Sequence, residues 1–230
     1  MSDATPILLY KISVWAAPLV LAITLHEAAH GFVARLCGDE TASRLGRVSL
    51  NPFKHIDPFG TILLPALLML SRAPFLFGYA KPVPVNFAAL RRPRLDSILV
   101  SAAGPAMNLL LALASALLFR FLFLLPQGAA LWFAENLRNA LFINVLLAVF
   151  NLLPIPPLDG GRVLVGLLPG AASRALAALE PFGMMILIGL LLFLPMLGAQ
   201  TGLDLNFVWQ GVARLTDRIV GAIVWIASRG

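Results

Sequence analysis

The stretch "LAITLHEAAHGF", residues 21–32, places two histidines and a glutamate inside an otherwise apolar run. Burying three ionisable groups in such a segment is costly unless they bind something. On a helix, His26 and His30 are spaced i and i+4, so both rings project from one face about one turn apart. Glu27 is offset by about 100° and can lie beside a ligand that the two rings hold.

This is the H-E-x-x-H arrangement, in which two neutral imidazoles bind zinc and the glutamate acts as general base on a metal-activated water. The alternative is a pair of core histidines bonded to neighbouring carbonyls, with Glu27 protonated. Ionisable residues inside an apolar membrane span are functional by default. We therefore favour a metal site at His26 and His30.

The composition identifies an integral membrane protein. Of the 230 residues, 60% are hydrophobic and 12% are charged, whereas a soluble domain carries roughly a quarter charged residues. The apolar excess forms long runs, and nothing resembles a second domain or an internal repeat, so residues 1–230 are expected to form one domain. The net charge of +6 comes from basic residues near the ends of apolar segments. That placement favours a lipid bilayer with anionic headgroups as the partner, and we expect no nucleic-acid partner.

The apolar runs predict an all-α polytopic fold with about four to six membrane segments. The expected segments are residues 7–25 (continuing as helix to 36), 59–79, 98–125, 140–153 and 182–197. The tail, residues 205–226, carries Arg214, Asp217 and Arg218, so we expect it either to cross or to lie in the interface. Two polar stretches, 44–58 and 78–94, each contain a short β-like run, at residues 47–50 and 82–85.

A catalytic zinc normally has three protein ligands, so a third is needed. His55 is the one remaining histidine, but it lies in a polar stretch and reads as a surface or hydrogen-bonding residue. The better candidate is Asp159 in "NLLPIPPLDGGRVL", residues 151–164, where three prolines break the helix and two glycines let the backbone bend around the carboxylate. The alternative is a loop aspartate just outside the membrane. The single cysteine, Cys37, excludes a cysteine-based metal cluster.

Three motifs in this order, "HEAAH" (26–30), "GPAMN" (104–108) and "NLLPIPPLDGG" (151–161), resemble the site-2 proteases, which are intramembrane zinc metalloproteases. "GRVSLNP", "HIDPFGT" and "GYAKPVPVN" further resemble a compact prokaryotic branch without a PDZ domain. The resemblance covers about residues 20–165. It implies one Zn²⁺ per chain held by His26, His30 and Asp159, with Glu27 as catalytic base and Asn108 contacting the substrate or its developing oxyanion.

The distribution of basic residues gives a topology that agrees with this ligand set. If both polar stretches are cytoplasmic, segment 59–79 is re-entrant, and Asp159 then returns to the side and depth of His30. A helix that enters near Lys11 puts His26 about 20–23 Å along, roughly two-thirds across a core of about 30 Å. The active site would therefore lie nearer the cytoplasmic side of a prokaryotic cell membrane. The basic residues are Arg35, which precedes the first stretch, Arg44, Arg47 and Lys54 within it, and Lys81, Arg91, Arg92 and Arg94 in the second stretch.

The sequence thus predicts a zinc metalloendopeptidase that hydrolyses peptide bonds in or near transmembrane segments of membrane proteins. Two alternatives remain at this stage. A membrane metal-binding protein or transporter could use the same ligands, but would need further polar residues along its spans. An inactive protease-like scaffold would usually lose the base, and Glu27 is present. The sequence leaves the substrate and the oligomeric state open.

Overall fold

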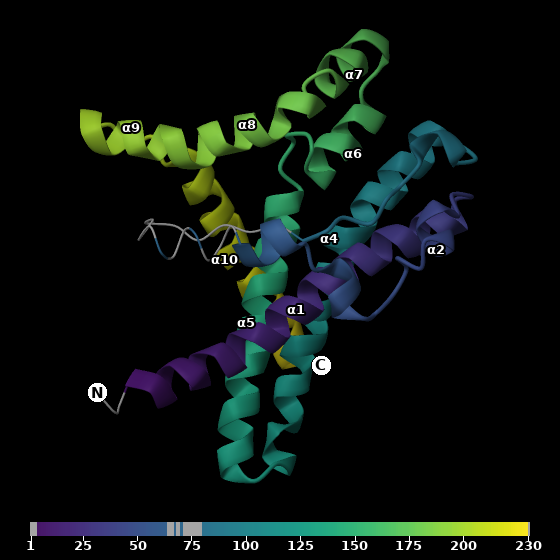
Figure 1. The fold of residues 1–230 in the computed structure, drawn as a ribbon. Coiled ribbons are helices and arrows are strands. Elements are labelled where there is room, and N and C mark those ends of the chain that lie inside the picture. Colours follow the sequence, from purple (N-terminus) through teal and green to yellow (C-terminus); the bar gives the residue numbers. More distant parts are fainter. Residues whose placement is uncertain (1–3, 64–66, 68–69, 71–79, 230) are drawn as a thin grey trace.

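The structure is a computed structural model that describes residues 4–63, 67, 70 and 80–229 (Figure 1). The described residues contain helices and no β-strand. The α-helices are α1 (Ala4–Leu36), α2 (Thr41–Arg44), α4 (Pro93–Leu118), α5 (Gln127–Asn151), α6 (Asp159–Leu167), α7 (Gly170–Ala177), α8 (Gly183–Ile188), α9 (Leu194–Thr201) and α10 (Phe207–Arg229). Short 3-10 or π turns are η1 (Pro52–His55), η2 (Pro58–Leu63), η3 (Phe87–Ala89), η4 (Phe119–Leu124), η5 (Glu180–Phe182) and η6 (Gly189–Phe193).

Helices α1, α4 and α5 form the centre of the fold. Helices α4 and α5 lie side by side and are joined through η4 at the bottom of Figure 1, while α1 crosses them. The start of α4 and the end of α5 therefore lie away from that connection, on the side where α1 ends. Among the described residues, four helical stretches are long and apolar enough to span a membrane: Leu9–Leu36, Pro93–Leu124, Gln127–Asn151 and Gly170–Thr201. The all-α polytopic prediction is confirmed.

Helix α5 begins well before the predicted start at residue 140. Polar residues in its first half, Asn136 and Asn139 among them, weaken the apolar signal there. Both side chains are buried, and each amide donates to a carbonyl: Asn136 to Trp132 in its own helix, Asn139 to Val14 in α1, each at 3.0 Å. Amides satisfied in this way fit inside a helix bundle without water.

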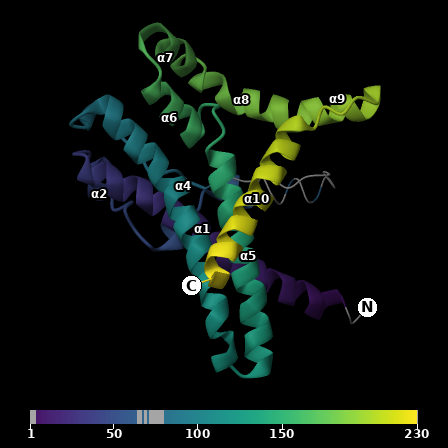
Figure 2. The same ribbon diagram turned by 180° about the vertical axis from the view of Figure 1, so that it is seen from behind.

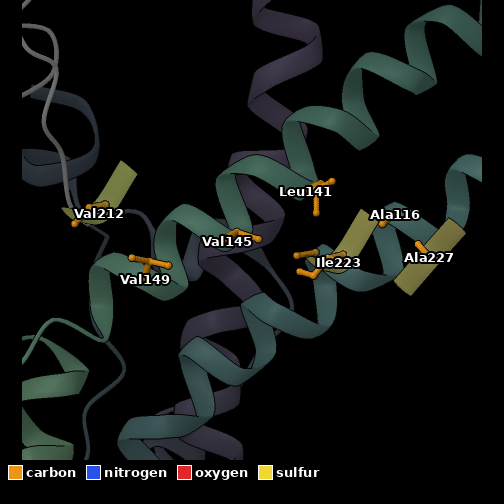
Figure 3. Close-up of a cluster of buried hydrophobic side chains, with 8 residues drawn as sticks. Ala116, Leu141, Val145, Val149, Val212, Ile223 and Ala227 are labelled. Atoms are coloured by element: carbon orange, nitrogen blue, oxygen red, sulfur yellow. The ribbon is translucent and has the colours of Figure 1, made fainter. Parts of the chain in front are cut away.

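Helix α10 packs along α4 and α5. The largest cluster of buried apolar side chains joins these three helices, and Figure 3 shows most of it. The stacked rings of Phe150 and Trp209 extend the contact to the end of α5. The tail therefore lies against two membrane helices, and its charged residues occupy the exposed side of α10. The cluster comprises Ala112, Ala116, Leu141, Val145, Val149, Val212, Ile223 and Ala227.

The segment after α5 first returns to α4 and then leaves the central bundle. A proline-rich turn leads into α6, which packs on α4, and into α7; α8, η6 and α9 then extend away from α4, past the end of α5 (Figures 1 and 2). Glycine at position 183 allows the start of α8 to approach the proline turn, because a Cβ there would lie 2.5 Å from the carbonyl carbon of Pro156.

The two predicted β-like runs are not strands. Residues 47–50 and 82–85 have no regular secondary structure. Proline interrupts the second run, and side chains, not a neighbouring strand, hold the first. The predicted re-entrant segment 59–79 falls largely outside the described residues. Its two flanks meet, because the Lys81 N–H donates to the His55 carbonyl at 2.9 Å.

Candidate metal centre and general base

Two histidine rings on one face of α1 form the first part of the centre. Both are buried, with exposed fractions of 7% for His26 and 9% for His30. The Nδ1 of His26 donates to the Asn108 amide oxygen at 2.5 Å, and the Nδ1 of His30 donates to the Val100 carbonyl at 2.7 Å. Because both acceptors lack a proton to give, each neutral ring carries its N–H on Nδ1. This leaves both Nε2 lone pairs free to bind a cation.

The carboxylate of Asp159 meets these lone pairs. Its Oδ2 lies 3.2 Å from Nε2 of His26 and 3.3 Å from Nε2 of His30, while the two Nε2 atoms are 3.1 Å apart. The Oδ2 atom is buried and accepts no hydrogen bond. With both rings neutral, three electron-pair donors converge with no N–H between them. Such an arrangement is stabilised by a cation, and the three side chains could hold a metal ion.

The spacing of these atoms fits zinc. Tetrahedral zinc with ligand bonds of about 2.0–2.1 Å requires ligand atoms about 3.3–3.4 Å apart, which is close to the three separations in the structure. A second observation concerns Gly104 on α4. A Cβ on this residue would lie 2.5 Å from Nε2 of His26 and 2.6 Å from its Cε1, and would also meet Nε2 of His30. Glycine therefore leaves open the space that both Nε2 atoms face.

Helix α6 delivers Asp159 to the histidines. The prolines after α5 end that helix, and α6 then begins at Asp159 itself. Gly160 and Gly161 allow α6 to lie directly on the turn, because Cβ atoms there would overlap backbone atoms of residues 152–156. The structure thus brings together the three predicted ligands, two from α1 and one from the first residue of α6.

Glu27 is held beside the centre by backbone. Its Oε2 accepts a hydrogen bond from the Val83 N–H at 2.7 Å. Pro82 and Pro84 flank Val83 and have no N–H, so Val83 supplies the single donor of this tripeptide. Arg47 fixes the tripeptide from the other side, donating to the carbonyls of Lys81 and Pro82 at 2.9 and 3.2 Å.

The same segment is also tied to the end of α1. The Asp39 carboxylate is fully buried and accepts from the backbone N–H groups of Thr41 and Asn86, at 2.9 and 2.7 Å. Burial by itself would raise the pKa of Asp39, but these hydrogen bonds outweigh it and leave the pKa below its ordinary value. Asp39 is therefore ionised at neutral pH and holds the two segments together.

Asn108 lies behind the metal centre, on α4. It is fully buried. Its amide oxygen accepts from His26, and its amide nitrogen donates to the Ala22 carbonyl at 3.2 Å and to the Asn144 side chain at 2.7 Å. In this arrangement the side chain orients the His26 ring, and both of its amide hydrogens are already used.

His55 is not brought to the metal centre. It is 2% exposed, and its Nε2 hydrogen-bonds to the Ser49 carbonyl at 2.9 Å. It is a buried hydrogen-bonding residue rather than a surface one. Sequence reasoning missed other contributors, namely the Val83 N–H, the Val100 carbonyl and Asn144. Backbone groups leave little signal in a sequence, although the two prolines around Val83 do single out its N–H.

Comparison with known proteins gives one family match and several related chains. Residues 14–138 and 126–194 match the family model of peptidase family M50. The chain is 40% identical over 185 residues to YwhC of Bacillus subtilis (strain 168), a protein named as a zinc metalloprotease, across 79% of this chain and 80% of that one. It is 34% identical over 173 residues to Rip2 of Mycolicibacterium smegmatis, also named as a zinc metalloprotease, across 75% of this chain and 64% of Rip2. No solved structure gives a significant match.

Proposed function

Because this chain belongs to peptidase family M50, the site-2 protease family, we propose that His26, His30 and Asp159 hold its zinc and that Glu27 is its general base. The chain is an intramembrane zinc metalloprotease with apolar helices long enough to span a bilayer. The observation that carries the assignment of the ligands is the convergence of three unprotonated ligand atoms, 3.1–3.3 Å apart. Bound zinc would supply Lewis acidity, polarising the scissile carbonyl and lowering the pKa of a water.

Glu27 accepts the proton of the attacking water and returns it to the leaving amine. Within the described residues the carboxylate accepts one hydrogen bond, from Val83 to Oε2, which leaves Oε1 to take the proton. Because Val83 lies between two prolines and Arg47 holds the preceding carbonyls, the base has a defined position before substrate arrives. Asn108 orients His26, and a direct role toward an oxyanion would require its amide to release Ala22 or Asn144.

The substrate is a membrane-protein segment or peptide that can unwind at the centre. A helical substrate hides its carbonyls in its own hydrogen bonds, so it must become extended before cleavage. The segment 82–85 is a place where an extended chain could pair by strand addition. The Val85 N–H and the Val83 carbonyl have no hydrogen-bond partner within the described residues, whereas the neighbouring N–H of Val83 is bound to Glu27.

We propose that the centre lies toward the cytoplasmic side of a cell membrane. Basic residues gather where α1 ends and α4 begins, and this is also the side from which α6 carries Asp159 to the histidines. An excess of lysine and arginine marks cytoplasmic ends of membrane helices. The same side holds Asp39 and the segment that fixes Glu27.

The experiment compares cleavage and zinc content in the purified protein. The probe is a single-span membrane protein in proteoliposomes, chosen by a cleavage screen with the unmodified chain. Glu27→Gln should abolish cleavage and retain zinc, because the ligands stay intact. His26→Ala should lose both, and His55→Ala should keep zinc because His55 bonds to Ser49 and not to the centre. Turnover by zinc-loaded Glu27→Gln, or zinc loss from His55→Ala alone, would overturn the assignment.

A further inference from the structure

Arg94, near the start of α4, hydrogen-bonds to the C-terminal end of α6, the helix that begins with Asp159. Its Nε donates to the Gly166 carbonyl at 2.7 Å, and its Nη2 donates to the carbonyls of Leu167 and Leu168 at 3.2 and 2.8 Å. These are last-turn carbonyls of α6, which lack partners inside the helix. A guanidinium can satisfy several of them at once because its donors have a fixed fork geometry, and its charge opposes the negative end of the helix dipole.

Helix α6 is seated closely at both ends. At its first turn, glycines lie on the backbone of residues 152–156. At its last turn, a Cβ on Gly166 would lie 2.5 Å from Cγ1 of Ile98 and 3.2 Å from the Arg94 carbonyl. The helix is therefore a short rod that rests on the turn after α5 and on α4. Its length, about 12 Å for nine residues, separates Arg94 from the carboxylate of Asp159.

The face of α4 that holds α6 also organises the histidines. The Val100 carbonyl holds His30, the Asn108 side chain holds His26, and Gly104 between them leaves space for a metal. Arg94 adds one further contact from α4, to the end of the helix that carries the third ligand. Helix α4 thus positions all three ligand side chains. It contacts the two histidines directly and positions Asp159 through α6.

We propose that Arg94 is a positioning residue for Asp159: its guanidinium holds the last turn of α6 on α4 and thereby sets the carboxylate at the metal centre. The proposal rests on the assignment of Asp159 as the third ligand. Removing Arg94 frees three carbonyls and lets α6 tilt about its first turn. Changes behind metal ligands typically lower metal affinity about 10–100-fold. Arg94→Ala is expected to weaken zinc binding by this factor although it lies more than two helical turns from the ligand.

The test measures zinc affinity by competition with a chelator, in detergent, for the full chain. The variants are Arg94→Ala, Arg94→Lys, Asp159→Ala and the double variant of Arg94→Ala with Asp159→Ala. Arg174→Ala on α7 is the matched control, since that arginine is exposed and its guanidinium makes no hydrogen bond or ion pair within the described residues. Lysine keeps the basic charge at this end of α4 but loses the fork, so Arg94→Lys should insert normally and bind zinc with intermediate affinity.

The double variant separates positioning from general destabilisation. When Asp159 is already absent, Arg94→Ala should weaken zinc binding by less than about twofold, because the two changes act through one ligand. Faster amide exchange confined to residues 159–168 in Arg94→Ala should accompany the loss. Unchanged affinity in Arg94→Ala, or an equal loss in both backgrounds, overturns the proposal while leaving the zinc ligands standing. Unchanged affinity in Asp159→Ala overturns the ligand assignment and, with it, the role of Arg94. If Arg94→Ala does not fold, Arg94→Lys decides the same question.

Discussion

Gly104 and His26 approach each other so closely that a Cβ on the glycine would lie 2.5 Å from Nε2 of the histidine. The ring is in turn fixed from behind by Asn108, so it has no room to retreat. The space between the helices at this level is accordingly bounded by α4 on one side and by the two histidines on the other. Gly104, a residue of the "GPAMN" motif with no chemistry of its own, thereby leaves open the space proposed for the metal.

Gly104→Ala is expected to lower the zinc affinity by more than about a hundredfold. The added methyl group would occupy the space that both Nε2 atoms face. Metal analysis of the purified protein measures this directly. Gly128→Ala is the matched control, since a Cβ there meets no atom within 4 Å. Full zinc content in Gly104→Ala would show that the metal lies elsewhere.

Asn108→Ala is expected to lower zinc affinity by about 10–100-fold, because the His26 ring loses the acceptor that orients it. Asn108→Asp keeps an acceptor at the same place and should retain most of the affinity. If instead Asn108 donates to an oxyanion, both variants should keep zinc and lose about 10²–10³ in turnover. Chelator competition and single-turnover cleavage on the same preparations distinguish the two roles.

Val83→Pro is expected to reduce turnover without loss of zinc, because it removes the N–H that holds Glu27 and leaves the ligands untouched. A hydrogen bond to a charged group contributes about 1.5–3 kcal/mol, so the reduction should be about ten- to a hundredfold. Val83→Ala keeps the N–H while removing most of the buried side chain. Equal turnover in the two variants would mean that packing, and not the hydrogen bond, is what Val83 contributes.

The sequence indicated the candidate ligands better than the groups that surround them. His26, His30 and Asp159 could be named because their chemistry is unusual inside apolar segments and because prolines interrupt the helix before Asp159. The groups that hold them could not, since the Val100 carbonyl and the Val83 N–H are backbone atoms present at nearly every position. Arg94 was read as a topology marker, and its three hydrogen bonds depend on where α6 ends in space.

The fold was likewise predictable from the sequence only in part. Apolar length predicted the first and third segments closely, as α1 and as α4 with η4. The start of α5 was missed because Asn136 and Asn139 look polar in sequence yet donate to carbonyls inside the bundle. The proline, glycine and asparagine around 47–50 and 82–85 also suggested turns or edge strands, but a strand needs a partner, and these runs bond to side chains instead.

Cys37 and an introduced Ala89→Cys should label from the same side of the membrane, opposite to Gly128→Cys in the first turn of α5. The Arg91 N–H donates to the Cys37 carbonyl at 3.0 Å, which joins the end of α1 to the segment around Ala89. We expect an impermeant thiol reagent to label Gly128→Cys in intact cells and the other two in inverted membranes. Each introduced cysteine is placed in a Cys37→Ala background.

Cys37 itself should react slowly at neutral pH. Burial, and next the Asp96 carboxylate, raise the pKa of its thiol, so the reactive thiolate is scarce and becomes more abundant as the pH rises. Labelling at raised pH with a permeant reagent establishes that the thiol is reachable. Outside labelling of Ala89→Cys alone would mean that segment 59–79 crosses the membrane once, and the three-ligand centre would then be impossible.

The hydrogen bonds that aim both histidine rings come from α4, so they exist whether or not an ion is present. In small zinc domains the ion is what makes the chain fold, and a chelator denatures them. Here the bundle is held by apolar packing among α4, α5 and α10. We therefore expect a chelator to remove zinc without unfolding the chain and added zinc to restore cleavage, so that turnover in a cell would depend on the supply of free metal.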